Sequence, residues 1–203
     1  MPKSLNHPEF VSADWFDRPA VTVAVDLLGC TLFRKVGNAI ARGQIVETEA
    51  YEAGDPAMAA YQRQTERNAV VFGPAGVAYV YRIYRQYHCF NIVCDRANFA
   101  STILIRAVHL DALPNWYSPT SASAKKEKLE KVAAGPGKLC RALEIDTSLR
   151  GLPIHPDSGL WVEPRAATET PLDITQTTRI GLSKGVDIPW RWYVTHSPAV
   201  SRR

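Results

Sequence analysis

The 203-residue chain contains no long apolar run and no apolar leader. No stretch of about 18 consecutive apolar residues occurs, which argues against a membrane-spanning helix. Met1–His7 is too polar for the core of a signal peptide, so we expect an intracellular protein, in the cytoplasm or nucleoid if bacterial, with no membrane partner. Internal repeats and linkers are absent as well. One domain over residues 1–203 is therefore the simplest organisation, with residues 1–12 loosely held and a monomeric state expected.

Cysteine pairs at metal-binding spacing are also missing. The four cysteines are Cys30, Cys89, Cys94 and Cys140. None forms a C-x-x-C pair, which in a reducing compartment indicates free, mostly buried thiols. The spacing of His88, Cys89 and Cys94 fits no common zinc site, so we expect neither a metal nor a cofactor.

The charge balance is only mildly basic. Lysine and arginine number 24 against 20 acidic residues, which gives a net charge of +4 and a pI of about 8.9. An excess of this size predicts binding to a polyanion only weakly. Any nucleic-acid hypothesis therefore depends on particular residues.

Strand patterns cluster in hairpins between helical patterns, without βαβ alternation. This arrangement predicts an α+β fold, a compact mixed domain with a largely antiparallel sheet and helices packed around it. Asp17-Arg18-Pro19-Ala20 is predicted to open a helix, with Pro19 suited to its first position, Asp17 as its cap and Gly29 as its stop. Strands are predicted at 31–34, 41–49, 77–83, 87–93 and 102–108. Two further helices are predicted at 125–133 and 138–143.

Two carboxylates stand near the end of the second predicted strand. Glu47 and Glu49 are two residues apart, so their side chains share one face. Such a pair either lies on a solvated face or enters a polar site, where one pKa is raised. Glu49 is the stronger candidate for acid–base work because it lies at the strand end, just before Tyr51.

Tyrosines dominate the next hairpin. Tyr79 and Tyr81 share a face of the 77–83 strand, a pattern that is usual for half-buried sheet residues. Tyr84-Arg85-Gln86 falls at the predicted tip, where an exposed ring beside a cation suits stacking into a duplex while holding phosphate. An enzyme that extrudes one base from a duplex can fill the gap with such a wedge.

Three basic features admit both a structural and a functional interpretation. Arg106 interrupts an apolar strand, so its guanidinium needs a carboxylate within the fold or a ligand phosphate. The helix start at Gly137-Lys138 could bind a phosphate or simply begin a helix. The lysine-rich 125–131 segment is either a solvated face or a contact to a DNA backbone.

These segments together resemble the alkyladenine, or 3-methyladenine, DNA glycosylase family of base-excision repair. The resemblance spans nearly the whole domain, and its motifs come in the same order. They are Phe16-Asp17-Arg18-Pro19, Asp26-Leu27-Leu28-Gly29, Ile45-Val46-Glu47-Thr48-Glu49-Ala50-Tyr51, Thr65-Glu66-Arg67-Asn68, Phe72-Gly73-Pro74, Tyr79-Val80-Tyr81, Tyr84, Asn91, Leu104-Ile105-Arg106-Ala107, Gly135-Pro136-Gly137-Lys138-Leu139 and Trp192-Tyr193-Val194.

The resemblance implies a curved sheet, a protruding DNA-inserting hairpin and a role for each matching residue. Glu49 is implied as the general base that activates a water, with Arg106 as catalytic support beside the DNA phosphates. Tyr51 and Tyr81 are implied to sandwich the flipped base.

Asn91 is implied to shape the pocket and reject guanine, and Tyr84 to intercalate. Arg85 and Lys138 are the candidate contacts to the DNA backbone. The implied reaction is metal-free hydrolysis of the N-glycosidic bond of an alkylated or deaminated purine, such as 3-methyladenine, ethenoadenine or hypoxanthine, in double-stranded DNA. It leaves an abasic site without strand cleavage.

Other functions remain open at this level. A damaged-DNA binder would flip bases with weak or altered catalysis. A carbohydrate hydrolase would need two opposed carboxylates across a cleft, which neighbours on one strand face supply badly. A module for RNA or nucleotides would prefer single strands and yield no abasic product.

The chain departs from the family pattern at two places in the expected site. Ala59 stands where many members carry a histidine in the base pocket, and Arg85-Gln86 stands where a glycine and a methionine or similar residue usually follow the inserting tyrosine. Losing an imidazole removes a polar contact to the base or sugar and enlarges the pocket.

We therefore predict that Ala59→His changes the ranking of lesions or raises the rate of base release. The measurement is base release from duplexes that carry single methylated, ethenoadenine or hypoxanthine lesions. Equal activity of the variant and the parent on every lesion would contradict the role assigned to this position.

Overall fold

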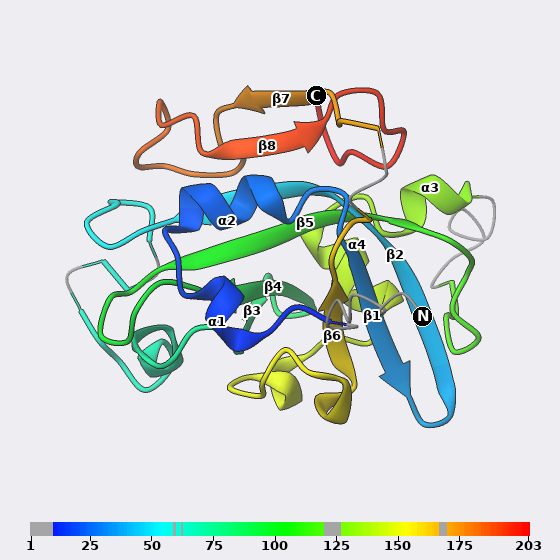
Figure 1. Ribbon diagram of the computed structural model, residues 1–203, viewed down its shortest axis with the longest axis horizontal. Helices are drawn as coiled ribbons and strands as arrows, with labels where there is room; N and C mark the ends of the chain where they lie inside the picture. The colour runs from blue at the N-terminus through cyan, green and yellow to red at the C-terminus, as the bar shows by residue number, and fades with distance from the viewer. Residues whose placement is uncertain (1–9, 59, 62, 120–126, 167–169) are drawn as a thin grey trace, which may run out of the picture.

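The computed structural model describes residues 10–58, 60–61, 63–119, 127–166 and 170–203, and an antiparallel sheet of eight strands dominates this part of the chain (Figure 1). The strands are β1 (Thr31–Val36), β2 (Ala39–Tyr51), β3 (Ala78–Ile83), β4 (Tyr87–Val93), β5 (Thr102–Leu110), β6 (Leu160–Glu163), β7 (Ile174–Thr177) and β8 (Arg191–Val194). Their order is β3-β4-β5-β2-β1-β6, and the β7–β8 pair joins through β2. The expected α+β domain with a curved antiparallel sheet is confirmed.

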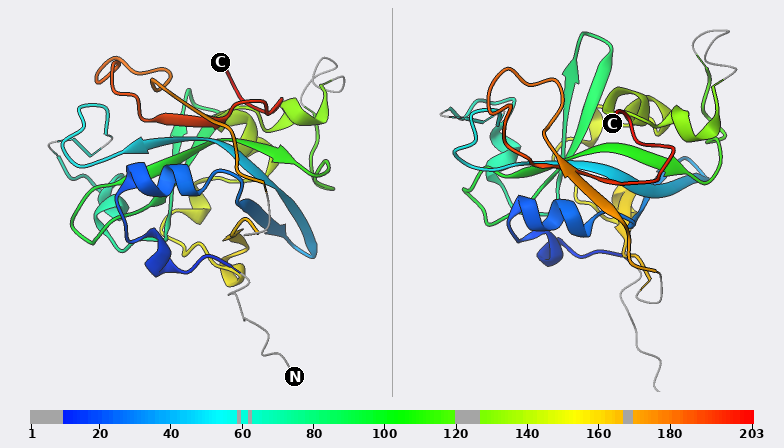
Figure 2. Two further views of the ribbon diagram at one scale, coloured as in Figure 1. Left: turned by 45° about the horizontal axis from the view of Figure 1, so that its top comes forward. Right: turned by 90° about the horizontal axis from the view of Figure 1, so that it is seen from above.

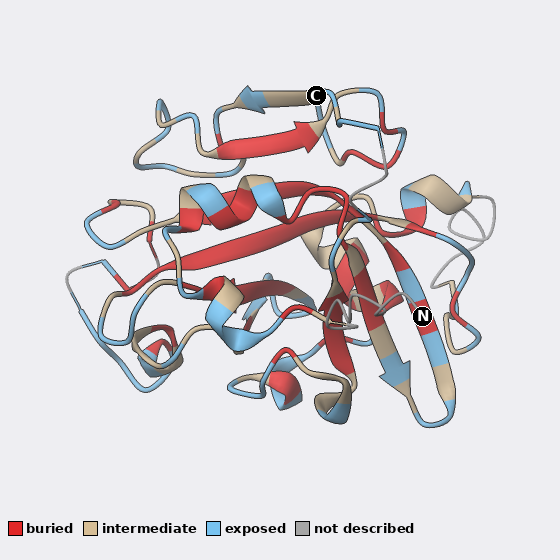
Figure 3. Ribbon diagram, in the orientation of Figure 1, coloured by how far each residue is buried: buried red, intermediate tan, exposed pale blue. Residues whose placement is uncertain are grey.

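Short helices cover both faces of the sheet. The helices are α1 (Ala13–Phe16), α2 (Ala20–Asp26), α3 (Leu129–Val132) and α4 (Pro136–Ala142), and the 3₁₀ turns are Ala69–Phe72, Thr147–Leu149 and Pro156–Ser158. Helix α2 packs on β2 and β5, and α4 packs on β4 and β5 from the opposite face (Figure 2). Strand β5 is therefore covered on both sides, and of its residues only His109 is more than slightly exposed (Figure 3). This burial explains the nearly continuous apolar sequence of β5.

The long strand β2 organises the sheet. One edge pairs with β5 along Gly43–Tyr51, while the other edge pairs first with β1 and then with β8. The register with β5 slips where this change of partner occurs, because Val46 on β2 and Arg106 on β5 have no paired residue opposite them. Irregularities of this kind bend a strand and redirect its side chains. Here the bend lies beside the two candidate carboxylates.

Two local predictions need correction. Asp17 does not cap α2; it ends α1, and Pro19 occupies the N-cap position of α2 with no side-chain cap. The predicted lysine-rich helix over 125–133 is reduced to the four residues of α3, because Lys128 has an extended backbone at its N-cap. The first part of that prediction, residues 125–126, lies outside the described residues.

The four cysteines are buried as expected, and none forms a disulfide. Gly29, at φ +85°, lies three residues beyond the end of α2 at Asp26, so the helix stops before the glycine that was predicted to end it. Among the residues that the structure describes, no helix is long and apolar enough to cross a membrane.

The β3–β4 hairpin projects from the body of the domain (Figure 2). Its strands pair up to Ile83 and Tyr87, which leaves Tyr84-Arg85-Gln86 as the tip. Both Tyr84 (φ 44°) and Arg85 (φ 65°) adopt the left-handed conformation, which favours glycine. The amide of Gln86 donates to the carbonyl of Tyr84 at 2.8 Å and closes the turn.

We predict that Arg85→Gly raises the free energy of unfolding by about 0.5 to 1 kcal/mol, because glycine removes the left-handed penalty at this position. Gln86→Gly is the matched control. Gln86 has no positive φ among the described backbone angles, so glycine there should lower stability. Urea denaturation followed by circular dichroism measures both. Destabilisation by Arg85→Gly as large as that by Gln86→Gly would mean that the tip is not strained.

Candidate active site

Four charged side chains form a buried cluster beneath the end of β2. Arg106 Nε donates to Glu47 Oε1 at 3.0 Å, and its Nη1 lies 3.2 Å from Glu49 Oε1. Arg191 Nη1 donates to Glu47 Oε1 at 2.7 Å. Two carboxylates thus meet two guanidinium groups, which balances the charge of the cluster. The alternative that Glu47 and Glu49 lie on a solvated strand face is excluded, since both are fully buried.

The cluster follows from the strand pairing. Glu47 and Glu49 lie on the segment of β2 that is enclosed by β5 on one side and β8 on the other. Arg191 faces Glu49 in the β2–β8 register. Arg106 is the unpaired residue of β5 at the register slip, so its side chain reaches both carboxylates. The C-terminal segment completes the cluster, because the amide and hydroxyl of Ser201 donate to Glu47 at 2.8 and 3.0 Å.

Arg106 is charged although it is buried. Burial opposes the charge of its guanidinium, but the carboxylates of Glu49 and Glu47 outweigh burial and raise its pKa. The structural alternative for Arg106, a salt bridge within the fold, is therefore present. The charge of Arg106 also lies directly beside Glu49, the candidate general base.

Glu49 is oriented by three partners. Tyr51 Oη donates to Oε2 at 2.7 Å, the amide of Ile180 donates to Oε1 at 2.8 Å, and Arg106 approaches Oε1. Burial and the nearby Glu49 carboxylate raise the pKa of Tyr51, so its phenol retains the proton that it donates. A carboxylate offers about four acceptor positions. One acceptor position on Oε2 therefore has no hydrogen-bond partner among the described residues.

A cavity of about 70 Å³ opens beside Tyr51. Its lining comes from β2, the loop after β2, the β3–β4 hairpin, β5 and the loop before β8. The lining residues are Tyr51, Ala57, Met58, Tyr79, Tyr81, Asn91, Thr102 and Leu182. Ligand pockets usually enclose about 300–1,000 Å³. In this conformation the cavity is therefore a narrow slot, and three of its eight lining residues are tyrosines.

The hairpin contributes the aromatic wall. Tyr79 and Tyr81 share a face as predicted, and their ring centroids lie 5.2 Å apart at 39°. Burial, followed by the adjacent Cys89 thiol, raises the pKa of Tyr81, so its hydroxyl stays neutral. Asn91 Nδ2 donates to the carbonyl of Tyr79 at 3.2 Å, which fixes the amide in the wall.

The other predicted residues are distributed differently. Tyr84 is 84% exposed at the hairpin tip, with Arg85 exposed beside it. Lys138, near the start of α4, forms an ion pair with Glu127. Ala59 lies outside the described residues, between Met58 of the cavity and Ala60. The structure therefore joins Glu49, Tyr51, Tyr81, Asn91 and Arg106 in or beside one site.

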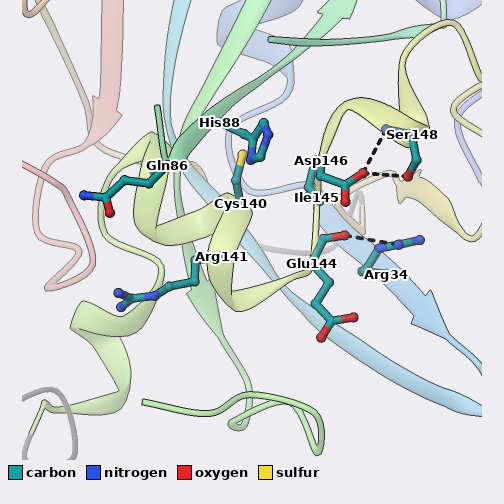
Figure 4. Close-up of a pocket in the computed structure, with 10 residues that line it drawn as sticks. Arg34, Gln86, His88, Cys140, Arg141, Glu144, Ile145, Asp146 and Ser148 are labelled. Atoms are coloured by element: carbon teal, nitrogen blue, oxygen red, sulfur yellow. Dashed lines mark hydrogen bonds between the residues drawn. The ribbon is translucent and has the colours of Figure 1, made fainter. Parts of the chain in front are cut away.

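A larger concavity of about 350 Å³ lies between β4, α4 and the turn after α4 (Figure 4). Its charged groups are used by the fold. Arg34 donates to the carbonyls of Leu143, Lys35, Gly159 and Glu144. Hydrogen bonds from Ser148 lower the pKa of Asp146. The tyrosine-lined cavity is therefore the better candidate, although it is smaller.

Several residues of the site carried no signal in the sequence. Arg179 and Ile180 lie in a polar loop without periodicity, and Asp55 lies in a turn. Arg179 forms a buried ion pair with Asp55, and Leu182 from the same loop lines the cavity. Only the alternating pattern of Arg191-Trp192-Tyr193 could have pointed to Arg191 as an inward-facing residue.

No cluster of three or more histidine, cysteine, aspartate or glutamate side chains is placed to hold a metal ion in the described part of the chain. The charged groups of the site are instead paired with one another.

A buried carboxylate with one acceptor position unused, beside a slot that three tyrosines line, is compatible with a hydrolase that acts on a flat substrate. The comparisons with known proteins agree with this class. Residues 14–198 match the sequence model of the family described as methylpurine-DNA glycosylase.

Full-length relatives give the same result. A protein of Synechococcus sp. (strain JA-3-3Ab) is 51% identical over 193 residues, covering 93% of this chain and 97% of the relative. A protein of Trichodesmium erythraeum (strain IMS101) is 46% identical over 197 residues, covering 96% and 98%. A protein of Methanoculleus marisnigri is 42% identical over 197 residues, covering 94% and 98%. Each is named "Putative 3-methyladenine DNA glycosylase".

The chain therefore belongs to the methylpurine-DNA glycosylase family. The resemblance read from the ordered motifs is confirmed, and the protein is a hydrolase of the DNA glycosylase type.

We predict that Glu47→Gln lowers the free energy of unfolding by about 3 kcal/mol, the scale of breaking a buried ion pair. The substitution leaves Arg106 and Arg191 with one carboxylate between them, and it can place an amide donor against the Ser201 amide. Denaturant unfolding at neutral pH measures the loss.

The matched control for Glu47→Gln is Asp111→Asn. Asp111 forms an ion pair with Arg42 at 2.8 Å in which both side chains are at least half exposed. Exposed pairs contribute about 0–1 kcal/mol. Equal losses in the two variants would show that the buried cluster does not stabilise the fold more than a surface pair does.

Proposed function

We propose that the protein is a monofunctional DNA glycosylase that removes alkylated or deaminated purines from double-stranded DNA. The substrate class would include 3-methyladenine-type bases, ethenoadenine and hypoxanthine. The product is an abasic site for base-excision repair, and the protein acts as a monomer. The observation that carries this proposal is the Glu49 carboxylate, which is held by Tyr51, Arg106 and Ile180 with one acceptor position left.

Glu49 acts as the general base. A water that donates to the open position on Oε2 attacks the sugar carbon C1′ while the C1′–N bond breaks and the base leaves with the bonding electrons. Glu49 receives the proton of the water, and the new C1′–O bond gives the abasic sugar. Arg106 positions the carboxylate and keeps its negative charge compensated. A cationic alkylated purine is already a good leaving group, so one activated water suffices.

Tyr51 and Tyr81 stack on the extruded base from either side. Aromatic faces contribute about 1–3 kcal/mol per stacked base, and a cationic base gains further from the ring quadrupoles. Asn91, fixed by its bond to the Tyr79 carbonyl, presents its amide to the base edge and discriminates against guanine. Ala59, which lacks the imidazole that many family members carry at this position, alters the base preference.

The hairpin tip contacts the DNA duplex. Tyr84, which is 84% exposed, enters the base stack in place of the extruded nucleotide, and Arg85 binds an adjacent phosphate. Lys138 can join the backbone contacts only when its ion pair with Glu127 opens. The slot of about 70 Å³ must widen to admit a purine, so the loops that carry Met58 and Leu182 have to move outward during binding.

We predict that the protein releases lesion bases under single-turnover conditions and that Glu49→Gln lowers this rate by at least about 100-fold, the scale of general-base catalysis. The substrates are duplexes that carry hypoxanthine, ethenoadenine or a methylated purine, in buffer with EDTA. Glu52→Gln is the matched control, because this nearby carboxylate accepts from the Val21 amide and does not border the cavity. It should retain most of the activity.

The outcomes separate the candidate functions. Base release by the parent and its loss only in Glu49→Gln support the glycosylase. Tight binding to an abasic-analogue duplex without release from any lesion would select a damaged-DNA binder that flips bases. Absence of both would overturn the proposal.

A further inference from the structure

Arg179 connects the walls of the cavity without lining it. Its guanidinium forms a bidentate pair with Asp55, in which Nη2 donates to Oδ1 at 3.0 Å, and Nη1 donates to the Ala50 carbonyl at 2.9 Å. Nη2 also donates to the Gly185 carbonyl at 3.3 Å. The next residue, Ile180, donates to Glu49. Arg179 thus connects the loop before β8 to the loop after β2 and to β2 itself, the strand that carries Glu49, the proposed general base.

The guanidinium of Arg179 also lies over an aromatic ring of the cage. Its central carbon is 4.6 Å from the ring centroid of Tyr51 and 5.4 Å from that of Trp190. The side chain is fully buried, so water does not screen its charge. Tyr51 lines the cavity, whereas Arg179 is not among the lining residues.

A second arginine–tyrosine contact lies at Tyr81, on the other wall of the cavity. Arg67 lies over Tyr81 at 5.6 Å, and its guanidinium donates to the Arg82 carbonyl at 3.2 Å. Arg67 is exposed, so solvent screens its charge. The two rings that we propose to enclose the base therefore have a cation each, one buried and one in water.

A cation on one face of a ring competes for the electron density that would attract a cation on the other face. Asp55 compensates part of the Arg179 charge. The guanidinium nevertheless contacts the ring, whereas Asp55 is held at the guanidinium edge. Arg179 therefore adds a nearby positive charge to the surroundings of the Tyr51 ring, whose hydroxyl donates to the Glu49 carboxylate. Stacking of a neutral purine depends little on this charge, but stacking of a cationic purine is weakened.

We infer that Arg179 is a specificity-determining positioning residue that, through Tyr51, lowers the preference of the cage for cationic over neutral purines. This inference depends on the proposed function, because it takes Tyr51 as a stacking surface for the extruded base. It assigns the substrate class more narrowly: neutral deaminated or etheno purines compete with cationic alkylated ones at this site.

The test compares single-turnover release of 7-methylguanine, which is cationic in DNA, with release of hypoxanthine, which is neutral. The variant Arg179→Met/Asp55→Asn removes the ion pair without leaving a lone buried charge, and its asparagine keeps an acceptor for the Ala57 amide. We expect the rate ratio of methylguanine to hypoxanthine to rise about fivefold relative to the parent. The intrinsic reactivities of the two lesions cancel in this comparison.

Two matched controls separate charge from geometry. Arg179→Lys keeps the charge but loses the bidentate geometry, so both rates should fall together and the ratio should stay near that of the parent. Arg67→Met removes the screened cation over Tyr81, and the ratio should change by less than about twofold. Equal rate losses for both lesions in the double variant would overturn the inference and leave Arg179 with a structural role only.

A second variant covers the case in which the double variant does not fold. In Tyr51→Leu, with Arg179 intact, the two rates should fall by similar factors if the arginine already weakens the cation–π attraction of Tyr51. A selective loss of methylguanine release in this variant would overturn the inference. Failure of the proposed function is seen separately, because the parent protein would then release neither base.

Discussion

The site depends on the burial of two carboxylates that would be costly to bury alone. Glu47 and Glu49 lie at the end of a strand that is enclosed on both edges, and the charges of Arg106 and Arg191 make that burial tolerable. Glu47 uses its oxygens entirely within the fold, with two guanidinium groups and Ser201 as partners. Glu49 shares Arg106 but keeps one acceptor position. The same cluster therefore anchors the C-terminal segment and, in the proposed mechanism, positions the carboxylate that acts as the general base.

The cavity is built in a similar way, from segments that are far apart in the chain. Tyr51 comes from β2, Tyr81 and Asn91 from the hairpin, and Leu182 from the loop before β8. Arg179 holds this loop against β2 through the Ala50 carbonyl and against the loop after β2 through Asp55. These contacts join both loops to Tyr51 and, through Ile180, to Glu49. In the proposed mechanism they would link opening of the slot to alignment of the carboxylate.

Much of the architecture was predictable because its signals are local. Alternating and apolar runs located β1 to β5, and the hairpin tip at Tyr84–Gln86 followed from the strands on either side. Errors arose where tertiary contacts or missing caps decide the structure. Asp17 ends one helix instead of capping the next, and α3 is shorter than its lysine-rich sequence indicated. The carboxylate pair was ambiguous for the same reason, since nothing local to Glu47 and Glu49 states that β5 and β8 enclose them.

The sequence by itself determined the fold class and the family and supplied five residues of the candidate site (Glu49, Tyr51, Tyr81, Asn91 and Arg106), because ordered motifs and strand periodicity are properties of the chain alone. Only the tertiary structure decided which charges pair. The register slip at Arg106 brings its guanidinium to both carboxylates, and the β2–β8 pairing adds Arg191. Arg179, Asp55 and Ile180 belong to the site solely through long-range contacts. Hydrogen bonds and charge compensation across distant segments are set by packing in three dimensions, and a linear pattern does not encode them locally.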